Sequence, residues 1–134
     1  MKLVRVIVEG LDEKGSYGIM EGDRICITDG SPLYGRMIKT GVEVSAGSVK
    51  TFLPPVEPPN IIALGLNYRE HARESKMELP CAPVIFLKAT TSATGHLQKI
   101  YLPMEAPGSV DYEAELVIVI GKIAKNVSEK EAGN

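Results

Sequence analysis

The N-terminal third of the chain alternates between apolar and polar positions, with short polar breaks between the alternating stretches. Successive side chains of a strand point to opposite faces, so this alternation predicts strands with one buried face. Gly22-Asp23 separates two of the stretches and is typical of a two-residue hairpin turn. We expect strands over residues 2–9, 16–21, 24–28, 42–44 and 49–53. Together they predict a small N-terminal β-module over residues 1–57.

Four prolines within Pro54–Pro59 mark the end of that module, because proline resists both helix and central strand. Beyond them, Asn67-Tyr-Arg-Glu70 has the residues of a variant capping box, which predicts a helix from Asn67 to about Lys76. Strands are expected over residues 60–66, 83–88 and 98–102, with a strand end over 122–127. We therefore expect a second unit over residues 58–134.

The most informative stretch is Val110–Gly121, in which three acids at alternate positions lead into an apolar tail. The tail Leu116–Ile120 is apolar on both faces, which predicts a strand that is covered on both sides. Glu113 and Glu115 would then share one face of the strand, with Asp111 just before them. Such carboxylates either lie in water at the strand end or bind a hard divalent cation through their oxygens.

His71 and Glu74 lie three residues apart on the predicted helix and therefore on one face. A carboxylate beside an imidazole orients it and stabilises its charged form, so the pair is a candidate for proton transfer. The alternative is a surface histidine with a charged neighbour. Lys88 ends a predicted strand and Ser92 follows in a loop, where the two are candidates for binding an anionic group. A solvated lysine at a strand end is the alternative there.

The composition of the 134 residues excludes several classes of protein. The formal net charge is −2 and no basic patch is visible, which argues against a nucleic-acid partner. No apolar run approaches the length that spans a membrane, and charges interrupt the first apolar run, unlike a signal peptide. Cys26 and Cys81 lack C-x-x-C spacing, so we expect reduced thiols in a cytoplasmic protein.

Four stretches, taken in order, resemble the fumarylacetoacetate hydrolase family: residues 61–74, 83–88, 110–121 and 126–131. The proline-rich approach to them and the small N-terminal β-module also match its prokaryotic members. The resemblance implies an α+β, mainly β fold: a mixed β-roll catalytic domain with a short lid helix, preceded by the small module. It also implies a homodimer in most cases.

For the site, the resemblance implies a Mg²⁺ or Mn²⁺ ion (Ca²⁺ in some members) held by carboxylates. Glu113 and Glu115 match two of the metal ligands, and His71 and Glu74 match the dyad that activates water. The implied substrates are small 2-oxo or dicarbonyl acids. We expect a metal-dependent hydrolase that cleaves a C–C bond in acylpyruvate-like or fumarylacetoacetate-like acids. The alternative within the family is a decarboxylase or an isomerase/tautomerase.

The chain departs from the family pattern at its end and in one loop. The family's third metal ligand, an aspartate, and a substrate-binding lysine follow the helix that would start at Ser128, yet the sequence ends at Asn134. We therefore expect residues 58–134 to be the front half of a catalytic domain. A non-catalytic fragment is the remaining alternative. After Lys88, the loop Gly95-His-Leu-Gln98 replaces the family's usual Gly-Pro-Gly-Asp.

Overall fold

The computed structural model describes residues 2–33 and 35–133 and is mainly β, with a single short α-helix among the described residues. This confirms the predicted α+β, mainly β class. The chain divides into two compact units, Glu57–Thr94 and the combination of Met1–Val56 with Gly95–Asn134. The division into residues 1–57 and 58–134 stays a prediction.

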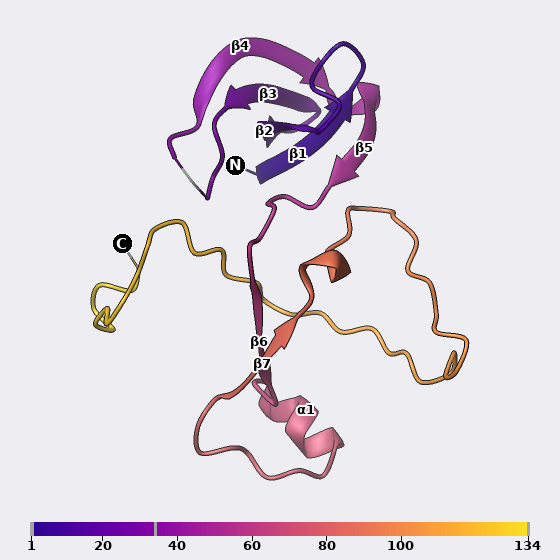
Figure 1. Ribbon diagram of the computed structural model, residues 1–134, viewed down its shortest axis with the longest axis vertical. Coiled ribbons are helices and arrows are strands. Elements are labelled where there is room, and N and C mark those ends of the chain that lie inside the picture. Colours follow the sequence, from indigo (N-terminus) through magenta and orange to yellow (C-terminus); the bar gives the residue numbers. More distant parts are fainter. Residues whose placement is uncertain (1, 34, 134) are drawn as a thin grey trace. The chain divides into compact units, whose positions relative to one another are not determined.

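A five-stranded antiparallel sheet forms the N-terminal part of the first unit (Figure 1). Its spatial order is β4-β3-β2-β1-β5, so each strand pairs with its sequence neighbour except β5, which returns to pair with β1. Glu21 pairs with Arg24 across the predicted Gly22-Asp23 turn, and Gly22 has the positive φ of +60° that such a turn needs. The strands are β1 (Lys2–Val8), β2 (Ser16–Glu21), β3 (Arg24–Asp29), β4 (Ile38–Ser45) and β5 (Val49–Leu53).

The core of this sheet is a cluster of four β-branched side chains: Val6, Val8, Ile25 and Ile27. They occupy alternate positions of β1 and β3, so the alternation seen in the sequence corresponds to one buried face. Arg5 is also buried on β1. Its Nη2 donates a hydrogen bond to the Lys14 carbonyl, and its guanidinium lies 5.8 Å from the centroid of the Tyr17 ring.

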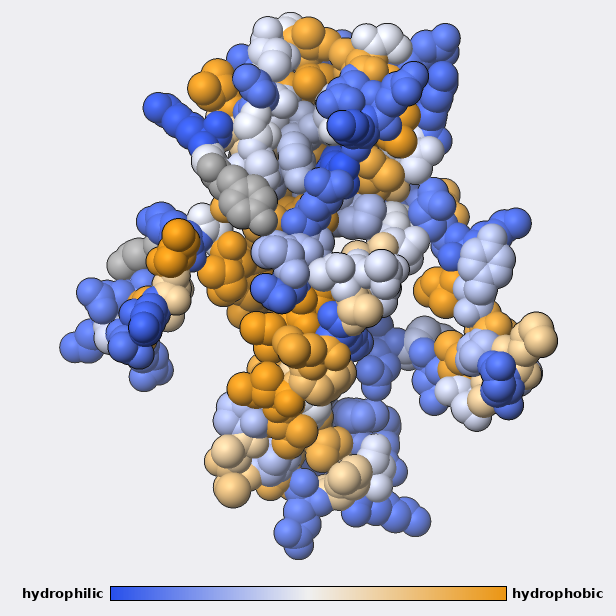
Figure 2. Space-filling view, viewed as in Figure 1, coloured by the Kyte–Doolittle hydropathy of each residue, from blue (hydrophilic) through white to orange (hydrophobic). Residues whose placement is uncertain are grey.

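The second unit contains a two-stranded antiparallel sheet and the helix. The elements are β6 (Ile61–Gly65), α1 (Arg69–Glu74), β7 (Val84–Lys88) and the 3₁₀ turn η2 (Thr90–Ser92). The two predicted strands are confirmed. Their apolar side chains are largely exposed, for example Ile62 of β6 at 65%. Figure 2 shows apolar side chains on the surface over these two strands. A two-stranded sheet contains no other strand or helix that could cover its two faces.

The helix is shorter than predicted. Tyr68, in extended conformation, is its N-cap residue and makes no side-chain capping bond, so the expected capping box at Asn67 is wrong. The Glu70 carboxylate instead accepts a hydrogen bond from Arg73 Nη1 at 2.8 Å. The Glu70 side chain therefore forms an ion pair with Arg73 within the helix and does not cap its N-terminus.

Residues 98–127 form no strand or helix, so the strands expected over 98–102, 110–121 and 122–127 are wrong. The apolar tail that was expected to be covered on both sides is exposed instead: Leu116 by 81%, Ile118 by 76% and Ile120 by 68%. A strand needs a neighbour for its backbone hydrogen bonds, and no described strand pairs with this stretch.

The expected helix start at Ser128 is a single turn. The Ser128 carbonyl accepts hydrogen bonds from the amides of Glu131 and Ala132, each at 3.0 Å, and its hydroxyl donates to Glu131 Oε2 at 2.6 Å. Within residues 2–33 and 35–133, no helix has the length and apolar character needed to cross a membrane.

Candidate functional site

α1 presents the two residues predicted to transfer protons. His71 and Glu74 lie three positions apart on this six-residue helix, and both are exposed. Side chains at this spacing share a helix face, about 5–6 Å apart at Cβ. Ala72 is the buried residue of the helix, at 1% exposed. The helix therefore buries Ala72, while the side chains of His71 and Glu74 lie at the surface.

Lys88 and Ser92, the predicted substrate-binding pair, lie at the far end of the same unit. The antiparallel register pairs Gly65 with Val84 and Ile61 with Lys88. Because α1 follows Gly65, the start of the helix and Lys88 lie at opposite ends of the two-stranded sheet, roughly 13 Å apart along the strand. The structure thus places these residues in one unit, but it does not bring Lys88 to the beginning of α1.

Both side chains have local contacts. Lys88 Nζ lies 5.8 Å from the centroid of the Phe86 ring, two residues earlier on the same face of β7. The Ser92 hydroxyl donates to the Ala89 carbonyl at 2.6 Å inside the 3₁₀ turn η2. The serine oxygen can still accept a hydrogen bond there, and the lysine remains exposed.

Glu113 and Glu115 belong to the other unit, in the stretch that has no regular secondary structure, and both are exposed. Among the described residues, no group of three or more His, Cys, Asp or Glu side chains is placed to hold a metal ion. A hard divalent cation takes six or more oxygen ligands. Two glutamates therefore supply only part of such a site, and water or substrate oxygens would have to add to them.

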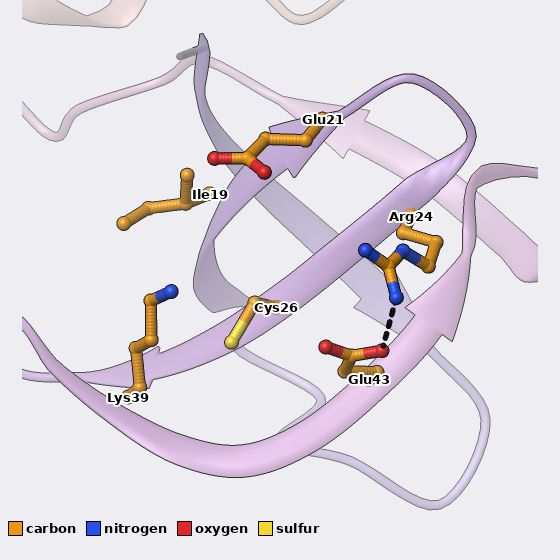
Figure 3. A pocket seen from close by; sticks show the side chains of 6 residues that line it. All are labelled: Ile19, Glu21, Arg24, Cys26, Lys39 and Glu43. Atoms are coloured by element: carbon orange, nitrogen blue, oxygen red, sulfur yellow. Dashed lines mark hydrogen bonds and ion pairs between the residues drawn. The ribbon is translucent and has the colours of Figure 1, made fainter.

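A shallow depression of about 90 Å³ lies on the five-stranded sheet, on the face opposite the core (Figure 3). Arg24 Nη1 pairs with Glu43 Oε2 across it at 3.4 Å, and both side chains are largely exposed, so the pair is well solvated. None of the predicted site residues lines it. The lining residues are Ile19, Glu21, Arg24, Cys26, Lys39 and Glu43.

Two local features have no signal in the sequence. His96 packs edge-on against Phe52 of β5 with ring centroids 6.1 Å apart. Leu66, at the junction of β6 and α1, has a left-handed backbone with a φ of +51°. The residue types alone do not indicate these features, because both depend on the path of the backbone in the folded chain.

Comparison with known proteins gives matches over most of the chain. Residues 60–134 match the family described as "Fumarylacetoacetate (FAA) hydrolase C-terminal", and residues 1–55 match the one described as "Rv2993c-like, N-terminal".

Among similar proteins, the fumarylacetoacetate hydrolase domain-containing protein 2 homolog of Dictyostelium discoideum is 53% identical over 78 residues, which are 58% of this chain and 25% of that protein. The mitochondrial oxaloacetate tautomerase FAHD2A of Bos taurus is 38% identical over 98 residues, or 72% of this chain and 31% of the tautomerase.

A solved structure of an uncharacterized protein from Mycobacterium abscessus aligns with a TM-score of 0.53 and 29% identity. The alignment covers 69% of this chain and 34% of that one. The chain thus spans about a quarter to two fifths of the length of the curated relatives that it matches.

Proposed function

The chain belongs to the fumarylacetoacetate hydrolase family, and from that premise we propose that the protein is an enzyme that tautomerises a small 2-oxo acid of the oxaloacetate type. The observation that carries the proposal is the helix α1, which exposes an imidazole and a carboxylate one turn apart. Relatives named oxaloacetate tautomerase, from Bos taurus and Xenopus laevis, align over 72% and 66% of the chain.

Tautomerisation makes the smallest demand on the described residues. The keto and enol forms differ by the position of one proton, which leaves a carbon beside the carbonyl and arrives at the carbonyl oxygen. His71 would take and return this proton, and Glu74 would orient the ring and stabilise its charged form. Hydrolysis of a C–C bond needs, in addition, a water that is activated to attack the carbonyl carbon.

Hydrolysis of a 1,3-dicarbonyl acid is the second candidate, favoured by the description of the matching family as a hydrolase. Decarboxylation of a 2-oxo acid is the third candidate. The proposal also includes a divalent cation, Mg²⁺ or Mn²⁺, with Glu113 and Glu115 as two of its ligands. Bound there, the ion would stabilise negative charge on the 2-oxo acid. A homodimer and a cytoplasmic location complete the proposal.

The test of the proton-transfer role compares two exposed residues of the same helix. Oxaloacetate is supplied as its enol, and the loss of enol absorbance is followed with and without Mg²⁺. We expect His71→Gln to lower the rate at least 100-fold, the usual contribution of a general base. Arg73→Gln removes the ion pair with Glu70 from the same helix and should change the rate less than 3-fold. Equal rates for the wild type and His71→Gln would refute the role.

Product analysis separates the reactions. Tautomerisation leaves a four-carbon acid, decarboxylation releases CO₂, and hydrolysis of acetylpyruvate yields pyruvate and acetate.

For the metal, Mn²⁺ binding is measured by isothermal titration with Glu113→Gln, Glu115→Gln and the control Asp111→Asn. We expect the two glutamate variants to weaken binding at least 10-fold and the aspartate variant to leave it nearly unchanged. Equal affinities for all three would contradict the ligand assignment.

A further inference from the structure

The link between β6 and α1 contains an unusual backbone conformation. Leu66 has a φ of +51°, in the left-handed region that glycine adopts easily and leucine rarely does. A glycine stands directly before it, yet Gly65 is not the residue with positive φ. Gly65 instead completes β6, where it pairs with Val84. The left-handed conformation is therefore adopted by Leu66, a residue type that rarely adopts it.

No side-chain capping bond fixes the start of the helix. Residues 66–68 are the whole connection, and Tyr68, the N-cap residue, is extended with a φ of −114° and makes no side-chain capping bond. The direction in which α1 leaves the sheet is thus set by the backbone of this link. Turning Leu66 to an ordinary extended conformation would redirect the chain before the helix begins.

The other end of α1 is closed in a matching way. Lys76 has a φ of +53°, and the amide of Met77 donates to the Ala72 carbonyl at 2.9 Å, which is the closing bond of a Schellman motif. The helix is therefore bounded by a left-handed residue on each side, and neither of them is glycine. Non-glycine residues in this conformation persist where the surrounding structure requires them, often beside functional residues.

We propose that Leu66 is a positioning residue: its left-handed backbone holds α1 in the orientation in which His71 and Glu74 meet the substrate. The proposal rests on the function proposed above for these two side chains. Leu66 itself touches no reacting atom. It acts through the helix, because its backbone sets the direction in which α1 leaves β6, and Ala72 of this helix is buried.

The test separates the backbone of Leu66 from its side chain. Leu66→Ile keeps the size and apolar character but is β-branched, which makes the left-handed region much less accessible. Leu66→Asn loses the apolar side chain but tolerates that region. We expect Leu66→Ile to lower kcat at least 10-fold with KM changed less than 3-fold, and Leu66→Asn to keep kcat within 3-fold. If the side chain mattered through packing, the order would be reversed, and that result would overturn the proposal.

Leu64 provides the matched control. It lies on β6 two residues earlier, is 43% exposed and has ordinary strand conformation. A β-branched residue is favourable in a strand, so Leu64→Ile should leave kcat unchanged. A loss at Leu64→Ile equal to that at Leu66→Ile would show a general sensitivity of this sheet, which contradicts a special role of the Leu66 backbone.

A second readout does not depend on activity. The chain contains two histidines, so the ring C–H signals of His71 and His96 can be followed together by NMR. Leu66→Ile should shift or broaden the His71 signal, whereas Leu66→Asn should leave it in place. His96, packed edge-on to Phe52 in the other unit, should be unchanged in both variants. A His71 signal that is unchanged in Leu66→Ile would overturn the inference whatever the rates are.

The two proposals fail in different ways. If the wild-type chain does not accelerate tautomerisation while the His71 signal follows the expected order, the proposed function is wrong and the positioning of α1 by Leu66 stands. If tautomerisation depends on His71 but the signal and kcat ignore the backbone preference at position 66, the proposed function stands and the positioning role is wrong.

Discussion

The substitution Ile25→Ala tests the core of the N-terminal sheet. Ile25 on β3 is fully buried, at 0% exposed, within the four-residue cluster. A β-carbon placed on Gly18 of the neighbouring strand would lie 2.6 Å from Ile25 Cγ2, so Ile25 packs directly over the glycine backbone. Gly18 has no side chain that could move into the space that the substitution leaves. The site should therefore keep most of the cavity.

The expected loss follows from the atoms removed. Ile→Ala deletes three carbon atoms, which at about 0.8 kcal/mol for each buried carbon amounts to roughly 2.5 kcal/mol of transfer free energy. A cavity that does not collapse raises the total to about 3–4 kcal/mol. A small domain whose core holds so few residues has a free energy of unfolding of only about 3–5 kcal/mol. We therefore expect Ile25→Ala to leave this sheet largely unfolded at 25 °C.

Ile38→Ala is the matched control, because it deletes the same atoms from β4 of the same sheet. Ile38 is 60% exposed, so the loss should be roughly 1 kcal/mol. The assay is urea unfolding followed by tyrosine fluorescence, which suits a chain with five tyrosines and no tryptophan. The intermediate variant Ile25→Val keeps the transition measurable, with an expected loss of about 1 kcal/mol. Equal midpoints for Ile25→Ala and Ile38→Ala would refute the assignment of the core.

Three further substitutions test local features. Lys76→Gly should stabilise α1 by about 1 kcal/mol, because glycine accepts the left-handed conformation after a helix, and the amide exchange of the helix would report this; faster exchange would contradict it. Gly95→Ala should detach the turn at residue 95 from β5, since a β-carbon there would collide with the Phe52 carbonyl oxygen, and the ring-current shift of the neighbouring histidine would be lost. Arg24→Gln should cost less than about 0.5 kcal/mol in urea unfolding, because the side chains of Arg24 and Glu43 are 72% and 53% exposed; a larger loss would show a buried role.

The hairpin of β2 and β3 could be predicted from the sequence because its pairing is local. β2 and β3 are adjacent in the chain and joined by Gly22-Asp23, so the alternation of side chains and the turn residues together specify the hairpin. The spacing of His71 and Glu74 likewise determined that both lie on one helix face, which follows from helix geometry alone. In both cases the relevant neighbours are a few residues apart.

What the tertiary structure decided concerns neighbours that are distant in the chain. The stretch Leu116–Ile120 has the composition of a covered strand but is exposed, because composition does not supply the partner strand that burial requires. Likewise, the pattern predicted a helix after β6 but not its exit through a left-handed Leu66. Apolar periodicity determines which face of a segment is able to be buried, whereas the path of the rest of the chain decides whether anything lies against that face.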